Sequence, residues 1–501
     1  MRLHRVLLLT AAILLSNAFV RADVTPYPLF TDNMVLQQGA TCPVWGKSDP
    51  GEKVEVTLER KDGKDPGITS VSATANDKGQ WQVGLTSLKP GVGCTLTIKG
   101  KNTIKFKNVA VGEVWIASGQ SNMEWPVNAS YNPLMMKAAS KNPNLRLFTV
   151  QKRTATSPLA DQDDLKHFSK WDECGPDNVG GFSAVAYHFG NHLQKSLNVP
   201  VGMIHTSWGG TPAEAWTSKE ALEADPMLKY YAASAANAAK GKQPVGPHTP
   251  ASLYNAMIHP LLPFAIQGAI WYQGESNAGK AYEYRTLFPA MIQDWRKQWG
   301  RDFPFLCVQL APFNDGDADG VRYAELRDAQ LFATKKLKSV GMAVITDVGD
   351  LFDIHPKDKA TVGTRLALAA RGMVYGEKIV SSGPAYKEIK IDGASAILSF
   401  DSLGGGLAAR TGPANFNPNA PIYGFEICGE DREFFPAKGT IKGETVVVSS
   451  PKVKQPVAVR FGWKNYPVVN LFNKTQDGKQ TALPASPFRT DDFPLTTMPR
   501  K

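Results

Sequence analysis

Between residues 109 and 376, apolar runs typical of buried strands alternate with helical stretches, and this alternation constrains the fold more than any other feature of the chain. The run VAVGEVWIASG at 109–119 is apolar except for Glu113 and Ser118, as expected of a strand covered on both faces. Similar runs begin at residues 199, 266, 303 and 340, and alternate with helix patterns at 184–197, 253–264, 284–299, 324–337 and 361–376. Because strands joined by helices run parallel, we predict a parallel sheet with helices on both faces.

The segments on either side of this region have a different pattern. Residues 23–108 contain short alternating runs separated by turn residues, which is typical of antiparallel strands in a β-sandwich. Similar alternation returns over 377–501, with Gly- and Pro-rich breaks such as SLGGGL. We therefore predict an α/β domain over 109–376, flanked by an N-terminal β-sandwich-like domain and a C-terminal β-rich region.

The first 22 residues have the features of a secretory signal peptide. A basic start, MRLHR, precedes the apolar run VLLLTAAILL, and a small-residue cleavage site follows at Ala22. Nothing later in the chain approaches the roughly 20 uninterrupted apolar residues of a transmembrane helix. The expectation is an exported protein, periplasmic or extracellular, without a transmembrane segment.

Composition narrows the possible partners and cofactors. Hydrophobic residues make up 43% and charged residues 20% of the chain, so it can bury a large core. The formal charge of +10 falls to +7 when the basic signal segment is removed, and the remaining Lys and Arg are scattered. The sequence has no basic stripe interleaved with aromatic residues, so nucleic-acid binding is not expected.

The five cysteines lie far apart and form no CxxC pair, so no metal site and no cofactor is expected from them. Export would favour a disulfide, and Cys42 with Cys94 is the most plausible pair. The alternative is that all five are buried free thiols.

Polar clusters follow four of the predicted strands of the α/β segment. They are SGQSN after EVWIA, SWGGT after VGMIHT, YQGESN after GAIW, and DLFDIHP after GMAVIT. Since the carboxyl ends of parallel strands share one edge of the sheet, these clusters are expected to converge where such sheets bind ligands. Ser121, in the first cluster, is the candidate nucleophile.

A nucleophilic serine needs a base to accept its proton. His355 is the histidine that best fits this role, because it lies on a loop after a strand, with Asp353 two residues before it and Pro356 after it. The other seven histidines fall in the leader, within or at the ends of predicted helices and strands, or in loops without a partner motif: His4, His167, His188, His192, His205, His248 and His259.

The sequence around the serine argues against the nucleophile elbow of α/β-hydrolases, because the G-x-S-x-G pattern would require a second glycine where Met123 stands. A serine at the first strand-to-helix turn, with Asp and His late in the chain, instead resembles the SGNH hydrolases. Within them, the strings SGQSNMEW, SWGGTPAEAW, WYQGESN and DIHPKDK are similar to the sialate O-acetylesterase family. The resemblance covers most of the chain, including the flanking β regions.

This resemblance implies roles for individual residues. Ser121 is the expected nucleophile and His355 the expected base. The backbone N–H groups of Ser121 and of Gly209, or its neighbour Gly210, and the side-chain amide of Asn277 are the expected oxyanion donors. Glycine lets the backbone approach a substrate closely, and a neutral amide can donate to an anion.

Three further residues near the strand ends are candidate substrate contacts. They are Gln120, Trp208 and Gln273, although the two glutamines are expected to link the motif loops. Trp208 belongs to a group of tryptophans near the same strand ends, some of which would stack on a sugar ring while others pack in the core.

The acid of the triad is ambiguous. SGNH hydrolases often have Asp-x-x-His, whereas here Asp353 precedes His355 by two residues and Phe352 stands where that Asp would be. Asp353 is the first choice for orienting His355. Glu275 is the rival, because it follows a neighbouring strand, and the third alternative is a Ser–His dyad supported by backbone or water.

The resemblance implies a metal-independent carbohydrate esterase that removes O-acetyl groups from sialic acid or other acetylated glycans through an acetyl-serine intermediate. An acetyl xylan or mannan esterase of plant polysaccharides remains an alternative. A non-catalytic carbohydrate-binding protein would predict loss of Ser121, His355 or Asn277, all of which are present. A lipase-like hydrolase is disfavoured by the missing glycine. Sequence does not indicate the oligomeric state.

Overall fold

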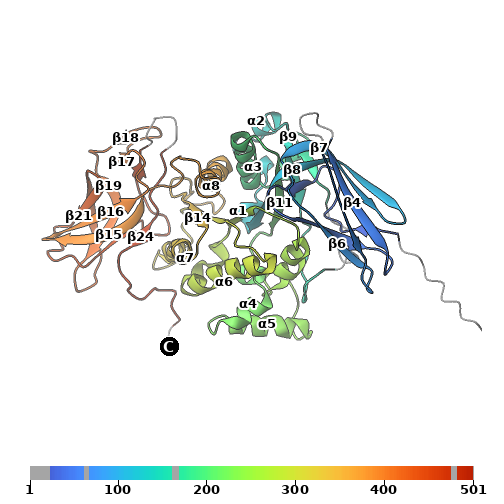
Figure 1. The fold of residues 1–501 in the computed structure, drawn as a ribbon. Coiled ribbons are helices and arrows are strands. Elements are labelled where there is room, and N and C mark those ends of the chain that lie inside the picture. Colours follow the sequence, from blue (N-terminus) through green and yellow to red (C-terminus); the bar gives the residue numbers. More distant parts are fainter. Residues whose placement is uncertain (1–22, 61–66, 161–168, 475–481, 500–501) are drawn as a thin grey trace, which may run out of the picture.

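The computed structural model describes residues 23–60, 67–160, 169–474 and 482–499. A central α/β part lies between two β-rich parts formed by the two ends of the chain (Figure 1). This is the predicted fold class: an SGNH-like α/β fold with flanking β domains. The predicted signal peptide lies outside the described residues.

The N-terminal part contains two groups of strands, which run antiparallel apart from the short β2. One group consists of β1 (Thr25–Pro26), β3 (Cys42–Lys47) and β6 (Gln80–Leu85). The other consists of β4 (Lys53–Arg60), β5 (Gly67–Thr74) and β7 (Gly91–Lys99), with β2 (Val35–Gln37) pairing separately with β8 (Thr103–Gly119).

Strand β8 links the N-terminal and central parts. Its side chains alternate between exposed and half-buried up to Asn108, and every residue from Val109 to Gly119 is buried. The change falls at the boundary predicted from the sequence, but it does not separate two independent sheets. A single strand of 17 residues belongs to both, so the N-terminal strands extend the catalytic sheet.

The central strands form the order β10-β9-β11-β8-β12-β13-β14. All pair in parallel except β10, which is antiparallel to β9. Their bounds are β9 (Asn142–Thr149), β10 (Asp172–Cys174), β11 (Val201–Ser207), β12 (Gly268–Tyr272), β13 (Phe305–Val308) and β14 (Val340–Ala343). Strands β11, β12 and β13 are buried throughout, which explains why β12 and β13 are apolar and why β11 is apolar up to Ile204.

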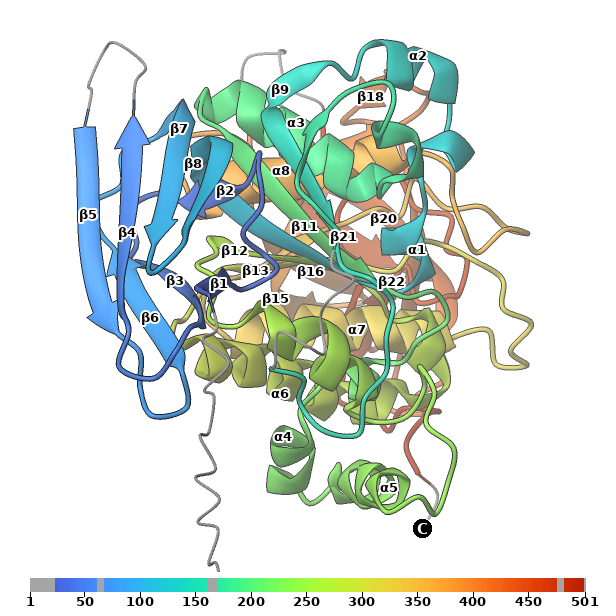
Figure 2. The same ribbon diagram turned by 90° about the vertical axis from the view of Figure 1, so that its right-hand side faces the viewer.

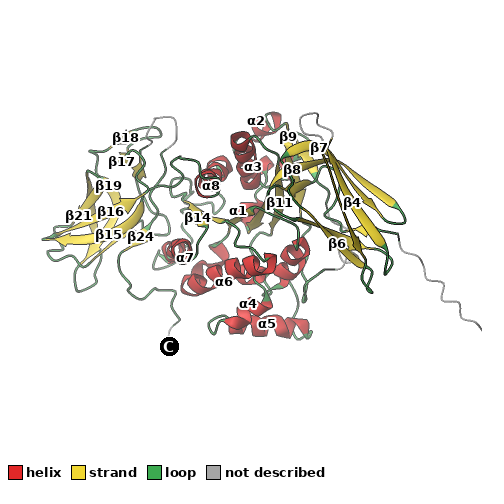
Figure 3. Cartoon of the chain, viewed as in Figure 1, coloured by secondary structure: helices red, strands yellow, loops and turns green. Residues whose placement is uncertain are grey.

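Helices cover both faces of this sheet (Figures 2 and 3). Helices α3 and α8 pack together on one face, and α6 and α7 pack together on the other. The α-helices are α1 (Ser121–Glu124), α2 (Pro133–Ala138), α3 (Ala184–Leu197), α4 (Lys219–Ala224), α5 (Lys229–Ala239), α6 (Ala281–Trp299), α7 (Arg322–Lys336) and α8 (Lys359–Met373). Short 3₁₀ turns are η1 (Val127–Ala129), η3 (Val179–Gly181), η4 (Ala213–Trp216) and η7 (Glu275–Lys280).

The predicted helix at 253–264 is wrong in type. The structure has a π-helical turn η5 (Tyr254–Ile258) followed by a 3₁₀ turn η6 (His259–Leu261). Pro260 and Pro263 explain the difference, because proline has no N–H group to continue α-helical hydrogen bonding.

The C-terminal part is a β domain with its own hydrophobic core, which includes Phe425, Phe461 and Phe488. An antiparallel sheet has the order β15-β16-β21-β20-β19-β22-β24, and a smaller one has the order β18-β17-β23. The strands are β15 (Ala385–Asp392), β16 (Ser395–Asp401), β17 (Leu407–Arg410), β18 (Phe416–Asn417), β19 (Ile422–Cys428), β20 (Phe435–Lys442), β21 (Thr445–Ser449), β22 (Ala458–Phe461), β23 (Leu471–Asn473) and β24 (Phe488–Arg489).

The C-terminal domain is joined to the α/β part by buried polar contacts. The guanidinium of Arg327, on α7, donates to the carbonyl oxygens of Lys464 and Asn465 over 2.8 and 2.7 Å. The side chain of Asn465 in turn accepts from the N–H of Tyr323 over 2.9 Å. These bonds fix α7 against the C-terminal domain.

All five cysteines are buried thiols outside disulfides, so the structure does not contain the Cys42–Cys94 disulfide. The Cys42 thiol donates to the carbonyl oxygen of Gln37 over 3.0 Å, and burial raises its pKa to about 12. Within the described ranges, none of the helices has the length and apolarity needed to cross a bilayer.

Candidate active site

Ser121 lies at the carboxyl end of β8, where the chain turns sharply into α1. Gly119 makes this turn possible, because it has a φ of +139° and a Cβ there would lie 2.1 Å from the carbonyl oxygen of Tyr272. The next residue, Gln120, donates its N–H to the same oxygen over 3.0 Å. The end of β8 is therefore held tightly against β12, and Ser121 starts the helix at the strand end.

His355 comes from a loop that crosses the strand ends. Strand β14 is separated from β8 by β12 and β13, so three inter-strand steps, about 14 Å, must be covered. The loop after β14 covers them and brings His355 Nε2 to 2.8 Å from Ser121 Oγ. The two residues predicted as nucleophile and base are thus at hydrogen-bond distance, as proton transfer between them requires.

Two neighbours hold the imidazole of His355. The Trp125 ring stacks on it, with ring centroids 4.8 Å apart and planes 17° from parallel. Asp353 Oδ1 lies 3.6 Å from Nδ1 and accepts the backbone N–H of His355 itself over 2.8 Å. Asp353 therefore closes the sharp turn at Ile354 and supplies a negative charge beside the ring, without a direct hydrogen bond to Nδ1.

The environment of His355 favours the neutral imidazole. Burial is the largest cause of its lowered pKa, and the positive charge of Lys359 acts in the same direction. The carboxylate of Asp353 opposes both. A neutral imidazole can accept a proton, which is the protonation state that a general base needs.

Glu275 occupies a different position from the one expected of a triad acid. Its Oε1 accepts a hydrogen bond of 2.7 Å from the side-chain amide of Asn122. Among the described carboxylates, Asp353 is the one within ion-pair distance of the His355 ring. The geometry therefore favours Asp353 over Glu275 as the partner of His355.

The predicted oxyanion donors differ in their availability. The N–H of Ser121 lies in the first turn of α1, where N–H groups have no partner within the helix. Gly209 is close to the nucleophile, since a Cβ on Gly209 would lie 3.3 Å from Ser121 Cβ. Its N–H, however, already donates to Glu124 Oε2 over 2.6 Å. Gly209 is therefore not a free donor in this conformation. For the N–H of Gly210, no hydrogen bond is found in the part of the chain that the structure describes.

The side chain of Asn277 is buried and strongly hydrogen-bonded. Its oxygen accepts from the Ala213 N–H over 2.9 Å and from Gln273 over 2.7 Å, and its nitrogen donates to Glu214 over 2.9 Å. An amide nitrogen has two hydrogens, so one is not used by Glu214. The role of Asn277 as an oxyanion donor stays a prediction.

Gln120 and Gln273, considered as substrate contacts from the sequence, have buried side chains that are hydrogen-bonded to the motif loops. Gln120 is 3% exposed, and its Oε1 accepts from the N–H groups of Gly274 and Ser276. Gln273 is fully buried and bonds Thr211, Asn277 and Tyr284. Both therefore connect the motif loops inside the protein, which is the role expected for the two glutamines from the sequence.

Trp208 remains a candidate substrate contact because its ring is half-buried. The ammonium group of Lys152 lies 5.5 Å from the ring centroid, and the same group forms an ion pair with Glu124. An aromatic face beside charged groups is a suitable surface for a sugar ring.

Asn122, Glu124 and Lys359 were not expected in the site from the sequence, whereas Trp125 is one of the tryptophans expected near these strand ends. All four lie inside the strings SGQSNMEW and DIHPKDK that carried the resemblance. Their positions beside Ser121 and His355 were the available signal.

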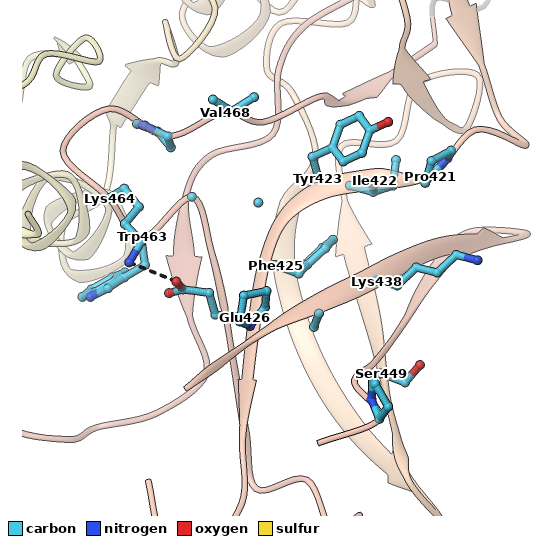
Figure 4. Close-up of a pocket in the computed structure, with 16 residues that line it drawn as sticks. Pro421, Ile422, Tyr423, Phe425, Glu426, Lys438, Ser449, Trp463, Lys464 and Val468 are labelled. Carbon is cyan, nitrogen blue, oxygen red and sulfur yellow. Dashed lines mark ion pairs between the residues drawn. The ribbon is translucent and has the colours of Figure 1, made fainter. Parts of the chain in front are cut away.

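A groove of about 570 Å³ lies on the C-terminal domain and shares no residue with the Ser121–His355 site. Tyr423, Phe425 and Trp463 are among its lining side chains, and Glu426 pairs with Lys464 at its edge over 3.1 Å (Figure 4). It is mainly apolar, and the Ser121–His355 site is chemically distinct from it.

Comparisons with known proteins agree with this geometry. The family model "Carbohydrate esterase, sialic acid-specific acetylesterase" matches residues 111–371. The human sialate O-acetylesterase is 31% identical over 502 residues, covering 91% of this chain and 90% of its own. The rat sialate O-acetylesterase is 33% identical over 425 residues, covering 74% and 77% respectively. A solved structure, a carbohydrate acetylesterase from Xanthomonas citri, is 39% identical with a TM-score of 0.81, covering 94% of this chain and all of its own.

The parallel sheet, the serine at its first strand-to-helix turn and the late histidine loop define an SGNH-type hydrolase fold with β domains on both sides. The chain belongs to the carbohydrate esterase family of sialic acid-specific acetylesterases, and it is an ester hydrolase.

Proposed function

We propose that the protein removes O-acetyl groups from sialic acids or related acetylated glycans, with Ser121 as the nucleophile. The observation that carries the proposal is the 2.8 Å separation of His355 Nε2 and Ser121 Oγ at the carboxyl ends of the parallel strands. The names of the relatives supply the substrate class: sialate for the human and rat proteins, and carbohydrate more generally for the Xanthomonas citri protein.

The reaction would proceed in two halves. Ser121 Oγ attacks the acetyl carbonyl carbon while His355 Nε2 takes its proton, and the resulting oxyanion accepts backbone N–H bonds. The sugar oxygen then leaves with the proton from His355, and acetyl-Ser121 remains. Water attacks this ester with His355 again as the base, and acetate and free serine are released.

Residues 1–22 support export as part of the proposal, because a basic start, an apolar run and a small-residue cleavage site are the pattern of a secretory signal peptide. Cleavage after Ala22 is the corresponding expectation. N-terminal sequencing of protein recovered from culture medium or periplasm tests it, and an uncleaved cytoplasmic product would contradict it.

The function is tested by acetate release from a panel of acetylated substrates: O-acetyl sialic acids, acetyl xylan and acetyl mannan. Ser121→Ala should abolish release from every substrate, while Ser196→Ala, at an exposed position on α3, should behave as the unmodified protein. Faster acetate release from O-acetyl sialic acids supports sialate as the substrate. Faster release from acetyl xylan or acetyl mannan would show that the same chemistry acts on plant polysaccharides. Full activity of Ser121→Ala would overturn the mechanism.

A further inference from the structure

Lys359 is a fully buried lysine at the first position of α8. Its ammonium group donates to the side-chain oxygen of Asn122 and lies 5.7 and 5.5 Å from the ring centroids of Trp125 and Tyr272. Burying a charged group costs free energy unless it is paired or hydrogen-bonded. A lysine in this position therefore requires a reason.

Asn122 connects Lys359 to the catalytic residues. Its amide nitrogen donates to Glu275 Oε1 over 2.7 Å and to the carbonyl oxygen of Ile354 over 3.0 Å. Both amide hydrogens are used, and the amide oxygen accepts from Lys359. Two acceptors on one side and a cation on the other leave a single favourable orientation for this amide.

The residues on either side of these bonds are the reacting ones. Asn122 directly follows Ser121, and Ile354 directly precedes His355. One side-chain amide thus joins the turn that carries the nucleophile to the loop that carries the base. The loop after β14 has to cross two strands to reach Ser121, so a bond at this point limits how far it can move.

We propose that Lys359 is a positioning residue of the esterase, which fixes the Asn122 amide and so keeps His355 at hydrogen-bond distance from Ser121. The inference rests on the proposed function, because it assigns a role within the same Ser121–His355 site. Lys359 itself does not contact Ser121 or His355 through a described hydrogen bond.

The charges around the amide fit this role. Glu275 Oε2 is buried and has no hydrogen-bond partner among the described residues, so the carboxylate depends on Asn122 and on the nearby cation. Burial lowers the pKa of Lys359 to about 7, and the carboxylates of Glu275, Asp353 and Asp358 act against this shift. The ammonium and the Glu275 carboxylate thus stabilise each other across one amide.

Lys359 also affects the base. Its positive charge lowers the pKa of His355, while Asp353 raises it. Removing the Lys359 charge is therefore expected to raise the pKa of His355 and to shift the acidic limb of the rate profile to higher pH. A lysine that only filled space in the core would not have this effect.

The test compares Lys359→Met with Lys357→Met, using p-nitrophenyl acetate hydrolysis by the whole protein. Methionine resembles the lysine side chain in shape but cannot donate to Asn122. Lys357 is exposed and lies two residues before Lys359, in the loop that leads into α8, which makes it a matched control. We expect Lys359→Met to lower kcat by roughly 10- to 100-fold with little change in KM, as for small misplacements of reacting groups. Its acidic limb should move to higher pH, and Lys357→Met should match the unmodified protein.

A second variant covers the case in which Lys359→Met fails to fold because Glu275 is left without a counter-charge. Lys359→Met/Glu275→Gln removes both charges, a change that proteins tolerate better than the loss of one partner. It should fold, with the same fall in kcat and the same direction of pH shift. Unchanged kcat and pH profile in this variant, or its failure to fold, would overturn the positioning role. Ser121→Ala is measured in parallel. The proposed function fails if Ser121→Ala stays active, whereas the positioning role of Lys359 can fail while Ser121→Ala is inactive.

Discussion

The backbone N–H of Gly209 donates to the carboxylate of Glu124 over 2.6 Å, directly beside Ser121. A methyl group on Gly209 would lie 3.2 Å from this carboxylate and 3.3 Å from Ser121 Cβ. Because Gly209 has no side chain, the chain after β11 can lie in contact with both the Glu124 carboxylate and Ser121. Because the N–H is already occupied, Gly210 is the better candidate for the second backbone donor to an oxyanion.

Gly209→Ala should lower kcat on the order of 10-fold, since Ser121 or Glu124 must move by a few tenths of an ångström and small displacements of reacting groups are costly. Steady-state kinetics with p-nitrophenyl acetate measure the effect. Gly181→Ala is the control, because a Cβ there meets no atom within 4 Å. Equal rates for the two variants would show that the Gly209 contact has no influence on the reaction.

Asp353→Asn should shift the acidic limb of kcat/KM to lower pH, because Asp353 raises the pKa of His355. Its kcat should fall on the order of 10-fold, less than a complete loss of acid–base catalysis, since Oδ1 lies 3.6 Å from Nδ1. A pH–rate profile of each variant is the measurement.

Glu275→Gln provides the comparison for Asp353→Asn. It keeps an oxygen that can accept from Asn122, so its acidic limb should stay close to that of the unmodified protein. A larger kcat loss in Glu275→Gln than in Asp353→Asn, with a shifted limb, would make Glu275 the acid of the triad.

The unmodified protein should remain active in mildly acidic solution. The general base must be neutral, and the pKa of His355 lies below the ordinary value of about 6.5 for histidine. Activity is therefore expected to rise with pH through an inflection below that value and then to level off. An inflection above about 7 in kcat/KM would contradict the environment described for His355.

Asn277→Ala should have two effects. It removes the donor to buried Glu214 and the acceptor for Ala213 and Gln273, and each unsatisfied buried group costs about 1–3 kcal/mol. Its Tm should therefore fall. If the remaining amide hydrogen serves the oxyanion, kcat should also fall on the order of 10²-fold with KM nearly unchanged.

Glu214→Gln separates the two effects of Asn277. It disturbs the same buried network but retains the Asn277 amide. A kcat loss as large as that of Asn277→Ala would make Asn277 a structural residue, whereas a much smaller loss supports the oxyanion role.

Most helices and strands could be predicted from the sequence, because the buried face of each element determines where its apolar residues lie. The helix pattern at 184–197 coincides with α3, and the mainly apolar run from Val109 coincides with the fully buried part of β8. Strand β9 was missed, although it pairs in parallel with β11, because five of its eight residues are polar or proline. Its position is determined by the neighbouring strand rather than by its own pattern.

The meeting of Ser121 and His355 could be predicted because parallel strands bring their carboxyl ends to one edge of the sheet. The supporting contacts depend on side-chain geometry that the sequence does not specify. Lysine is almost always exposed, so the sequence gives no reason to bury Lys359. Likewise, the motif suggested an N–H donor at Gly209 but did not reveal that Glu124, three residues after the nucleophile, already accepts from it.

The most direct test of the account is the location of the acyl group. The protein is mixed with p-nitrophenyl acetate, quenched in acid within the first turnover and digested for mass spectrometry. The mechanism predicts one added acetyl group on Ser121, and no such adduct in Ser121→Ala. Rapid product formation without an acetylated Ser121, or acetylation of another residue with the same kinetics, would contradict a reaction through acetyl-Ser121.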